Sequence, residues 1–385
     1  MQVNIDVVAR QPRDRTVDAW RGLSVLVVIL CHVVTERYES RFDGSKLRAI
    51  SPPLHGFGAM AYQLKPVIYS LSSAAGTLAV QFFLVISGYI ITLGLVREHE
   101  RTGRVSLLAF YVRRAFRILP PALLVLAFTF LMTSLGYIVV TQRSFWLASS
   151  FLCNTTNECG WFLGHLWSLA VEEQFYLVWP CLLLLIGFRS VAQLAGVLLM
   201  LFLLLSQLRL LDVGRVDNGM CFACIAAGCL YATSPRLRSA IARRASVPLI
   251  ALAGVLLVCR PVMPLLFHGA QRIQELLTPA LICFVMFSCF KYRERLERLV
   301  IVRLLAALGL VSYGVYLWQQ LFLAAPDKYL HRSILDYTPA FLFISVLSYL
   351  VLERPLIRTG ARLSQALASE ALPAAPAAVG WSENG

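Results

Sequence analysis

The chain has 385 residues, of which 58% are hydrophobic, and its mean hydropathy is +0.70. Soluble domains of this length are less apolar, so the composition indicates a polytopic membrane protein and excludes an ordinary soluble enzyme. The net charge of +14 would suit a nucleic-acid binder, but no zinc-finger, zipper or RNP-type pattern accompanies it. In a membrane protein such a basic excess reports topology, so nucleic acid is not an expected partner.

The first residues, 1–18, are polar and carry several arginines, which predicts a cytoplasmic N-terminal segment. The apolar run that follows ends in Cys31-His32 and has no small-residue cleavage signature. We therefore expect an uncleaved first transmembrane helix and not a signal peptide.

Ten apolar runs have about the length that a bilayer requires. They cover residues 19–36, 74–96, 118–140, 161–187, 190–211, 218–233, 247–267, 275–290, 304–325 and 334–353. If the N-terminus is inside, 23 of the 35 basic residues fall in cytoplasmic segments, as the positive-inside rule requires. The sequence therefore predicts an all-α polytopic membrane protein of about ten transmembrane helices, with both termini cytoplasmic and residues 19–355 forming the membrane domain.

One outer segment holds a short apolar run and two cysteines. Phe145 to Cys153 is too short to cross a bilayer, so we interpret it as a re-entrant or interfacial piece. Cys153 and Cys159 flank a turn-like segment on the predicted outer side, where a disulfide can form. The sequence leaves both the oxidised and the reduced state open.

Two other segments indicate no chemistry. Cys221-x-x-Cys224 has no second cysteine pair, so packing is a better explanation than a metal or redox site, and no metal is expected. Residues 356–385 are rich in Ala and Pro, which predicts a disordered cytoplasmic tail.

The first span carries two ionisable residues, Arg21 and His32. Eleven residues are about three helical turns, roughly 16 Å, so both side chains point the same way. Ionisable groups inside an apolar span are costly and mark functional sites. The alternative is a snorkelling arginine and a histidine that only packs between helices.

The second span contains Phe82-Phe83-x-x-x-Ser87-Gly88. A Ser-Gly pair in a membrane helix permits close helix packing, and it also places a hydroxyl inside the bundle. Both interpretations remain open for this motif.

The third span opens with Arg113, Arg114 and Arg117, followed by two prolines. Arg114 and Arg117 are three residues apart and share a helix face, where two planar guanidinium groups can bind phosphates. Their cytoplasmic position favours a soluble, phosphate-bearing cofactor, whereas the alternative role is a topology anchor.

The fourth span is the most informative string, because it contains the adjacent carboxylates Glu172 and Glu173. His165 and Ser168 lie on the same helix face as Glu172, and Tyr176 follows one turn later. Carboxylates in an apolar span need cationic partners or a hydrated cavity.

Tyr313 in the ninth span and Glu353 at the end of the tenth add two polar groups. For Glu353 we consider two roles, a helix cap and a partner of a cytoplasmic arginine.

These five strings, in this order, resemble the membrane-bound acyltransferase family 3, whose members O-acylate bacterial cell-surface polysaccharides. The resemblance runs from Asp18 to Pro355. This chain has Leu317-Trp318-Gln319-Gln320 where family members often have Leu-Trp-His, and no hydrolase-like domain is appended.

The resemblance implies a multi-pass enzyme of the bacterial inner membrane that moves an acyl group, expected to be acetyl, from cytoplasmic acetyl-CoA to a hydroxyl of a glycan or lipid-linked saccharide. Neutral imidazole titrates near the working pH, so we expect His32 to act as the base. Arg21 and the third-span arginines suit the CoA phosphates, with Ser87-Gly88 nearby, and Glu172 or Glu173 is expected to orient His32 or an arginine. The acceptor, its acylated position and the oligomeric state stay open.

A proton-coupled transporter or flippase of a polar small molecule is the alternative, because buried carboxylates and a histidine also suit a carrier. Such carriers are often built from internal repeats. The motif strings occur once each in this sequence, which favours the enzyme.

Overall fold

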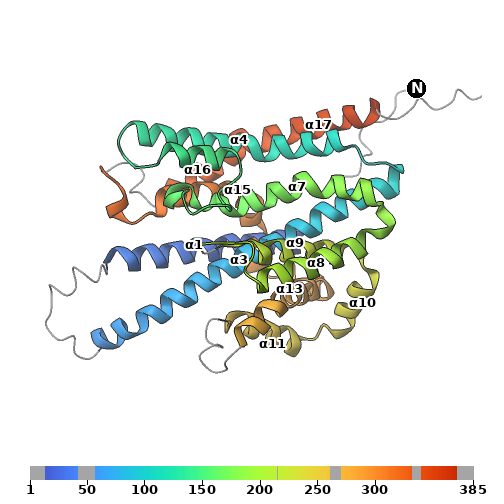
Figure 1. Cartoon of the computed structure of the whole chain (residues 1–385), viewed down its shortest axis with the longest axis horizontal. Coiled ribbons are helices and arrows are strands. Elements are labelled where there is room, and N and C mark those ends of the chain that lie inside the picture. The colour runs from blue at the N-terminus through green and yellow to red at the C-terminus, as the bar shows by residue number, and fades with distance from the viewer. Residues whose placement is uncertain (1–13, 42–56, 215, 261–269, 332–339, 371–385) are drawn as a thin grey trace, which may run out of the picture.

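The computed structural model describes residues 14–41, 57–214, 216–260, 270–331 and 340–370 (Figure 1). Apart from one two-stranded antiparallel ribbon, in which Val213 pairs with Val216, the regular structure of these residues is helical. The main elements are α1 (Arg15–Arg41), α3 (Phe57–Thr102), α4 (Leu107–Ser134), α5 (Gln142–Ser149), α6 (Gly160–Gly164), α7 (Leu166–Ile186), α8 (Val191–Gln207), β1 (Asp212–Val213), β2 (Val216–Asp217), α9 (Asn218–Thr233), α10 (Pro235–Arg244), α11 (Val247–Val258), α13 (Ala270–Ser288), α14 (Arg293–Leu296), α15 (Val300–Leu323), α16 (Ala340–Ser348) and α17 (Arg354–Glu370).

The described residues contain eight helices long and apolar enough to cross a membrane, or nine if α9 and α10, which meet at a bend of 94°, form one broken span. Each of the ten predicted runs overlaps a helix. The run at 247–267 contains the shorter α11, and the run at 334–353 contains α16 from Ala340; residues 261–267 and 334–339 of these two runs lie outside the described ranges. The all-α polytopic fold is therefore confirmed. The count of ten and the cytoplasmic placement of both termini stay predictions.

Two segments differ from the sequence prediction. Helix α3 begins at Phe57, well before residue 74, so its first turns extend beyond the predicted span. Residues 356–370, predicted to be disordered, belong to α17. This helix is ordered because it packs along α4, where Gly360 meets Phe116 and Ser364 is buried (Figure 1). Residues 371–385 lie outside the described residues.

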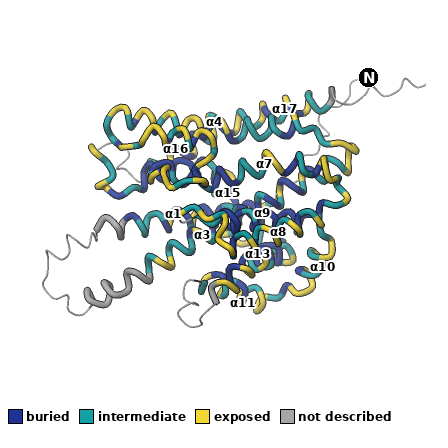
Figure 2. Tube along the Cα trace, in the orientation of Figure 1, coloured by how far each residue is buried: buried dark blue, intermediate teal, exposed yellow. Residues whose placement is uncertain are grey.

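Four helices, α1, α3, α9 and α15, form the centre of the bundle, and Figure 2 shows buried residues concentrated where they cross. Glycines make two of these crossings close. A Cβ at Gly22 of α1 would overlap the carbonyl of Leu305 on α15, and one at Gly88 of α3 would overlap the carbonyl of Ile225 on α9. Small residues at such points let helix backbones touch, which drives helix association in a bilayer.

The two ends of the bundle differ in chemistry. At one end, Cys153 and Cys159 form a disulfide in the segment before α6, so the pairing left open by the sequence is present. At the other end, arginines gather where α3 leads into α4: Arg101 at the end of α3, Arg104 in the turn and Arg113 in α4.

We expect Gly88→Ala to lower the thermal unfolding midpoint of the purified protein, because the methyl group must displace the α9 backbone at a cost of about 1–3 kcal/mol. The matched control is Gly94→Ala on the same helix, where an added Cβ meets nothing within 4 Å. Equal midpoints for the two variants in a detergent thermal melt would contradict the close crossing.

Candidate active site

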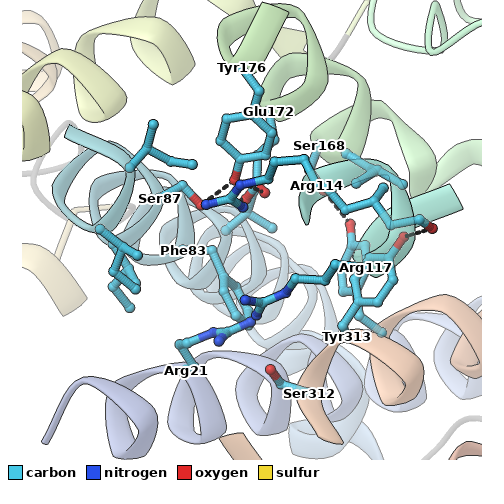
Figure 3. Close-up of a pocket in the computed structure, with 17 residues that line it drawn as sticks. Arg21, Phe83, Ser87, Arg114, Arg117, Ser168, Glu172, Tyr176, Ser312 and Tyr313 are labelled. Carbon is cyan, nitrogen blue, oxygen red and sulfur yellow. Dashed lines mark hydrogen bonds between the residues drawn. The ribbon is translucent and has the colours of Figure 1, made fainter. Parts of the chain in front are cut away.

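An inner cavity of about 100 Å³ lies between α1, α3, α4, α7 and α15 (Figure 3). Residues from the first four motif strings and from the segment around Tyr313 meet in its wall, although they are far apart in the sequence. The polar members of the wall are Arg21, Ser87, Arg114, Arg117, Ser168, Glu172, Tyr176, Ser312, Tyr313 and Tyr316. The cavity is thus the place where the bundle's intramembrane polar groups gather.

Glu172 is fixed by two hydroxyl groups. Its Oε1 accepts a hydrogen bond from Ser87 Oγ at 3.0 Å, and its Oε2 accepts one from Tyr176 Oη at 2.7 Å (Figure 3). The guanidinium of Arg114 lies over the Tyr176 ring, 4.6 Å from its centroid. The carboxylate therefore joins α3 to α7 and holds the aromatic surface on which Arg114 rests.

The arginines of α4 divide between two environments. Arg114 and Arg117 reach into the inner cavity with Arg21 of α1, whereas Arg113 donates to Glu98 Oε2 at 3.0 Å outside it (Figure 3). Three guanidinium groups and one carboxylate, Glu172, line the cavity, so its wall carries an excess of positive charge. Such a wall suits an anionic ligand.

A larger outer cavity of about 440 Å³ contains His32, toward the end of the bundle that holds the disulfide. Arg21 and His32 thus both face cavities from one side of α1, but each lines a different cavity. Val80 and Tyr316 line both cavities, and we call these two residues the neck. The Tyr316 hydroxyl donates to the His165 carbonyl at 2.7 Å and lies 2.6 Å from Ser168 Oγ.

His32 is oriented by the two consecutive glutamines of α15. The backbone N–H of His165 donates to Gln320 Oε1 at 3.1 Å, which turns the Gln320 amide nitrogen toward His32 Nε2, 3.4 Å away. The amide nitrogen can only donate, so His32 Nε2 must accept and Nδ1 must carry the hydrogen. That hydrogen is donated to Gln319 Oε1, 3.3 Å from Nδ1.

His165 itself is buried. Its Nδ1 lies 2.7 Å from Gln320 Oε1, and its Nε2 lies 3.1 Å from the Leu317 carbonyl oxygen. His165 also lines the outer cavity. It therefore supports Gln320, and through Gln320 it supports His32.

Some predicted site residues lie outside both cavity walls. Gly88 packs on α9, so its assignment to the cofactor site is corrected: residue 88 faces away from residue 87 on the helix. Phe82 stacks on Trp20 with ring centroids 5.0 Å apart, while Phe83 lines the cavity. Arg113 is paired with Glu98, as described above.

Glu173 and Glu353 are also placed away from the walls. Glu173 is next to Glu172 but turns to another side of α7, where its Oε1 is buried. Glu353 lies in the π-helical turn Tyr349–Glu353, is buried beside Gly314 and accepts a hydrogen bond from Ser348 at 3.4 Å.

Tyr313, by contrast, lines the inner cavity and donates to the Ile118 carbonyl at 2.9 Å. Within the described residues, the side-chain hydrogen-bond partners of His32 are the two glutamines and not a carboxylate.

The sequence analysis does not predict several residues of the outer cavity. Gln320 enters it only as a departure from the family pattern, and Gln81, Trp161 and Arg260 are not singled out. Gln319, the other glutamine of that departure, contacts His32 from outside the cavity wall. A usable signal existed for Gln81, since a glutamine inside an apolar span is costly unless it is hydrogen-bonded.

The chain is similar in sequence to a known protein family and to several curated proteins. The family model of the acyltransferase domain, Acyl_transf_3, matches residues 14–352. SACOL0978 of Staphylococcus aureus strain COL, provisionally named an O-acetyltransferase, is 36% identical over 154 residues, which are 36% of this chain and 25% of the relative. The O-acetyltransferase OatA of S. aureus strain NCTC 8325 is 34% identical over 145 residues, which are 34% of this chain and 24% of OatA. No solved structure gives a match.

The fold and the paired polar cavities define a multi-pass helical membrane protein with an intramembrane site. Because the family model covers most of its length, the chain belongs to the acyltransferase family 3. The matched region spans about a quarter of the length of these curated relatives.

The hydrogen-bond pattern predicts that His32 is the tautomer with hydrogen on Nδ1. Nitrogen NMR of ¹⁵N-histidine-labelled protein should show a protonated Nδ1 and an unprotonated Nε2 for this residue. In Gln319→Leu the preference should weaken, while the signal of His99, which stacks on Phe188 elsewhere, stays unchanged. An unaltered His32 spectrum in the variant would show that Gln319 does not fix the ring.

Proposed function

We propose that the chain is an O-acetyltransferase that moves an acetyl group from acetyl-CoA, bound from the cytoplasm, to a hydroxyl of a saccharide presented at the outer side of the bacterial inner membrane. The observation that carries the proposal is the pair of cavities that meet at the neck, one lined by three guanidinium groups and the other by His32. The family and the names of the OatA relatives support acyl transfer.

The donor site is the inner cavity. Arg21, Arg114 and Arg117 offer planar, permanently charged groups to the phosphates of CoA. Glu172 supports this wall, because it holds Tyr176 and Tyr176 in turn carries Arg114. The acyl end of the donor then points along α1 toward His32, about 16 Å from Arg21 along the helix.

His32 supplies the base. A saccharide hydroxyl is a weak nucleophile until its proton is removed. His32 Nε2 exchanges its 3.4 Å contact with the Gln320 amide for the acceptor hydroxyl and takes that proton, the hydroxyl oxygen attacks the thioester carbon, and the carbon–sulfur bond breaks. The proton then passes to the departing thiolate, which leaves as CoA and returns His32 to its neutral state. Gln319 accepts from Nδ1–H throughout and stabilises the protonated ring.

The two ends of the bundle support this direction of transfer. The disulfide Cys153–Cys159 lies in the segment that leads to Trp161, whose ring contacts His32. Disulfides persist in oxidising compartments, so the His32 cavity belongs to the outer side. The arginines gathered where α3 ends and α4 begins favour the cytoplasmic side for that end of the bundle, where acetyl-CoA is made available.

Replacing His32 by Ala should lower acetyl transfer by about 10²–10⁴-fold, the usual share of general-base catalysis. CoA binding should be unchanged, because His32 lines the outer cavity and not the inner one. Transfer is measured as acetylated product by mass spectrometry and CoA binding by calorimetry. A His32→Ala variant with full activity would remove this residue from the mechanism.

Arg114→Ala should weaken CoA binding about ten-fold or more, because a charge-assisted contact is worth roughly 1.5–3 kcal/mol. Arg113→Ala is the matched control: it removes an equal charge one residue away, but Arg113 binds Glu98 outside the cavity. Equal CoA affinity in the two variants would return both arginines to the role of topology anchors.

A further inference from the structure

Resting on the proposed function, we infer that the outer cavity is the acceptor site and that it is built for an uncharged saccharide unit, with Gln81 as a specificity-determining contact. Its volume of about 440 Å³ falls within the roughly 300–1,000 Å³ typical of pockets for small molecules. The main reason for assigning a neutral ligand is that charges balance in the outer cavity, whereas the inner cavity has an excess of positive charge.

The carboxylates of the outer cavity are paired with cations. Glu36 lies 2.6 Å from Lys328 Nζ, and Glu275 lies 3.0 Å from Arg209 Nη2. Asp217 lies 3.7 Å from the same arginine. Arg209 serves two of these three carboxylates, and Arg260 in the same wall supplies the third cation beside Arg209 and Lys328. The charges therefore balance, and the wall presents little net field to a ligand.

The inner cavity is different, since its three arginines face the single carboxylate of Glu172. An anionic ligand is therefore drawn to the inner cavity and gains little in the outer one. This difference lets the two substrates of one transfer reaction be sorted by charge.

The remaining wall has the groups that recognise sugars. Trp161, Trp167, Tyr69 and Tyr316 supply aromatic surface on which the C–H faces of a pyranose can pack. The ring of Trp161 is 5.5 Å from the ring of His32, so a sugar seated on this wall lies next to the base.

Gln81 directly precedes the motif Phe82-Phe83 and lines the outer cavity. It is 3% exposed and its Oε1 accepts from Arg260 Nη1 at 3.2 Å, which fixes the amide. With Oε1 engaged, the two hydrogens of Nε2 remain the donors of this side chain for a sugar hydroxyl. Gln81 and Phe83 lie on one helix but in the walls of different cavities, so changing Gln81 leaves the donor site intact.

The same face of α3 connects the two sites. Residues Tyr69, Ser73, Gly76, Val80, Phe83, Ser87 and Ile90 line one cavity or the other at intervals of three and four. From the first to the last is 21 residues, about 30 Å, which equals the thickness of the hydrocarbon core. One stripe of one helix therefore lines both sites across the membrane.

The test uses the purified full chain with acetyl-CoA and a panel of methyl glycosides. The neutral members are methyl glucoside, galactoside and rhamnoside, and the anionic member is methyl glucuronide. We expect the neutral glycosides to be acetylated with a kcat/KM at least about ten-fold above that of the glucuronide.

Gln81→Leu should raise the KM for the neutral acceptor about ten-fold and leave the CoA affinity unchanged. Gln193→Leu, the same change at an exposed position of α8, is the matched control.

A second variant covers the case in which Gln81→Leu fails to fold. Thr77 is exposed and lines the outer cavity, so Thr77→Lys adds a cation there without disturbing the core. It should raise the glucuronide-to-glucoside ratio of kcat/KM about ten-fold.

The outcomes separate two failures. If the wild-type chain acetylates the glycosides but shows no preference by charge, or neither variant changes acceptor kinetics, the acceptor-site inference is overturned and the proposed function stands. If the wild-type chain binds CoA but acetylates none of the glycosides, the proposed saccharide acceptor is overturned.

Discussion

An ionisable side chain in an apolar bundle is stable only when partners replace the water that it has lost, and most of this structure follows from that requirement. Glu172 is held by Ser87 and Tyr176, Glu36 by Lys328, and Glu275 by Arg209. Apart from the contact between Glu172 and Tyr176, which lie one turn apart on α7, these contacts join helices or segments that are distant in the sequence. The polar network therefore does more than satisfy charges, because it sets the positions of the helices around the two cavities.

Glycines at two helix crossings bring the helices close enough for the side chains of the site to touch. Gly22 lets α1 touch α15, and this contact brings His32 within reach of Gln319 and Gln320. Gly88 lets α3 touch α9 while Ser87, its neighbour, turns toward Glu172. A single Ser-Gly step thus serves packing on one face and the site on another, so both interpretations of this motif hold at once.

Much of the fold was predictable from the sequence. Long apolar runs identify the helices, since length and hydropathy are local properties. The common face of Arg21 and His32, and of Arg114 and Arg117, follows from helical period and was found. The sequence could not reveal which helices pack together. The sequence therefore offered Glu172 or Glu173 as a partner of either His32 or an arginine, whereas His32 has glutamine partners in the structure. Likewise, Ala- and Pro-rich composition hid the helical α17, which is ordered by its contact with α4.

The neck formed by Val80 and Tyr316 has a kinetic meaning under the proposed function. The donor and the acceptor each have a cavity of their own, and these cavities share only these two residues among those lining them. Incoming acceptor and departing CoA therefore do not compete for the same space, and neither substrate has to leave before the other arrives. In such an enzyme the acetyl group alone crosses the membrane, while CoA stays on one side and the acceptor stays on the other.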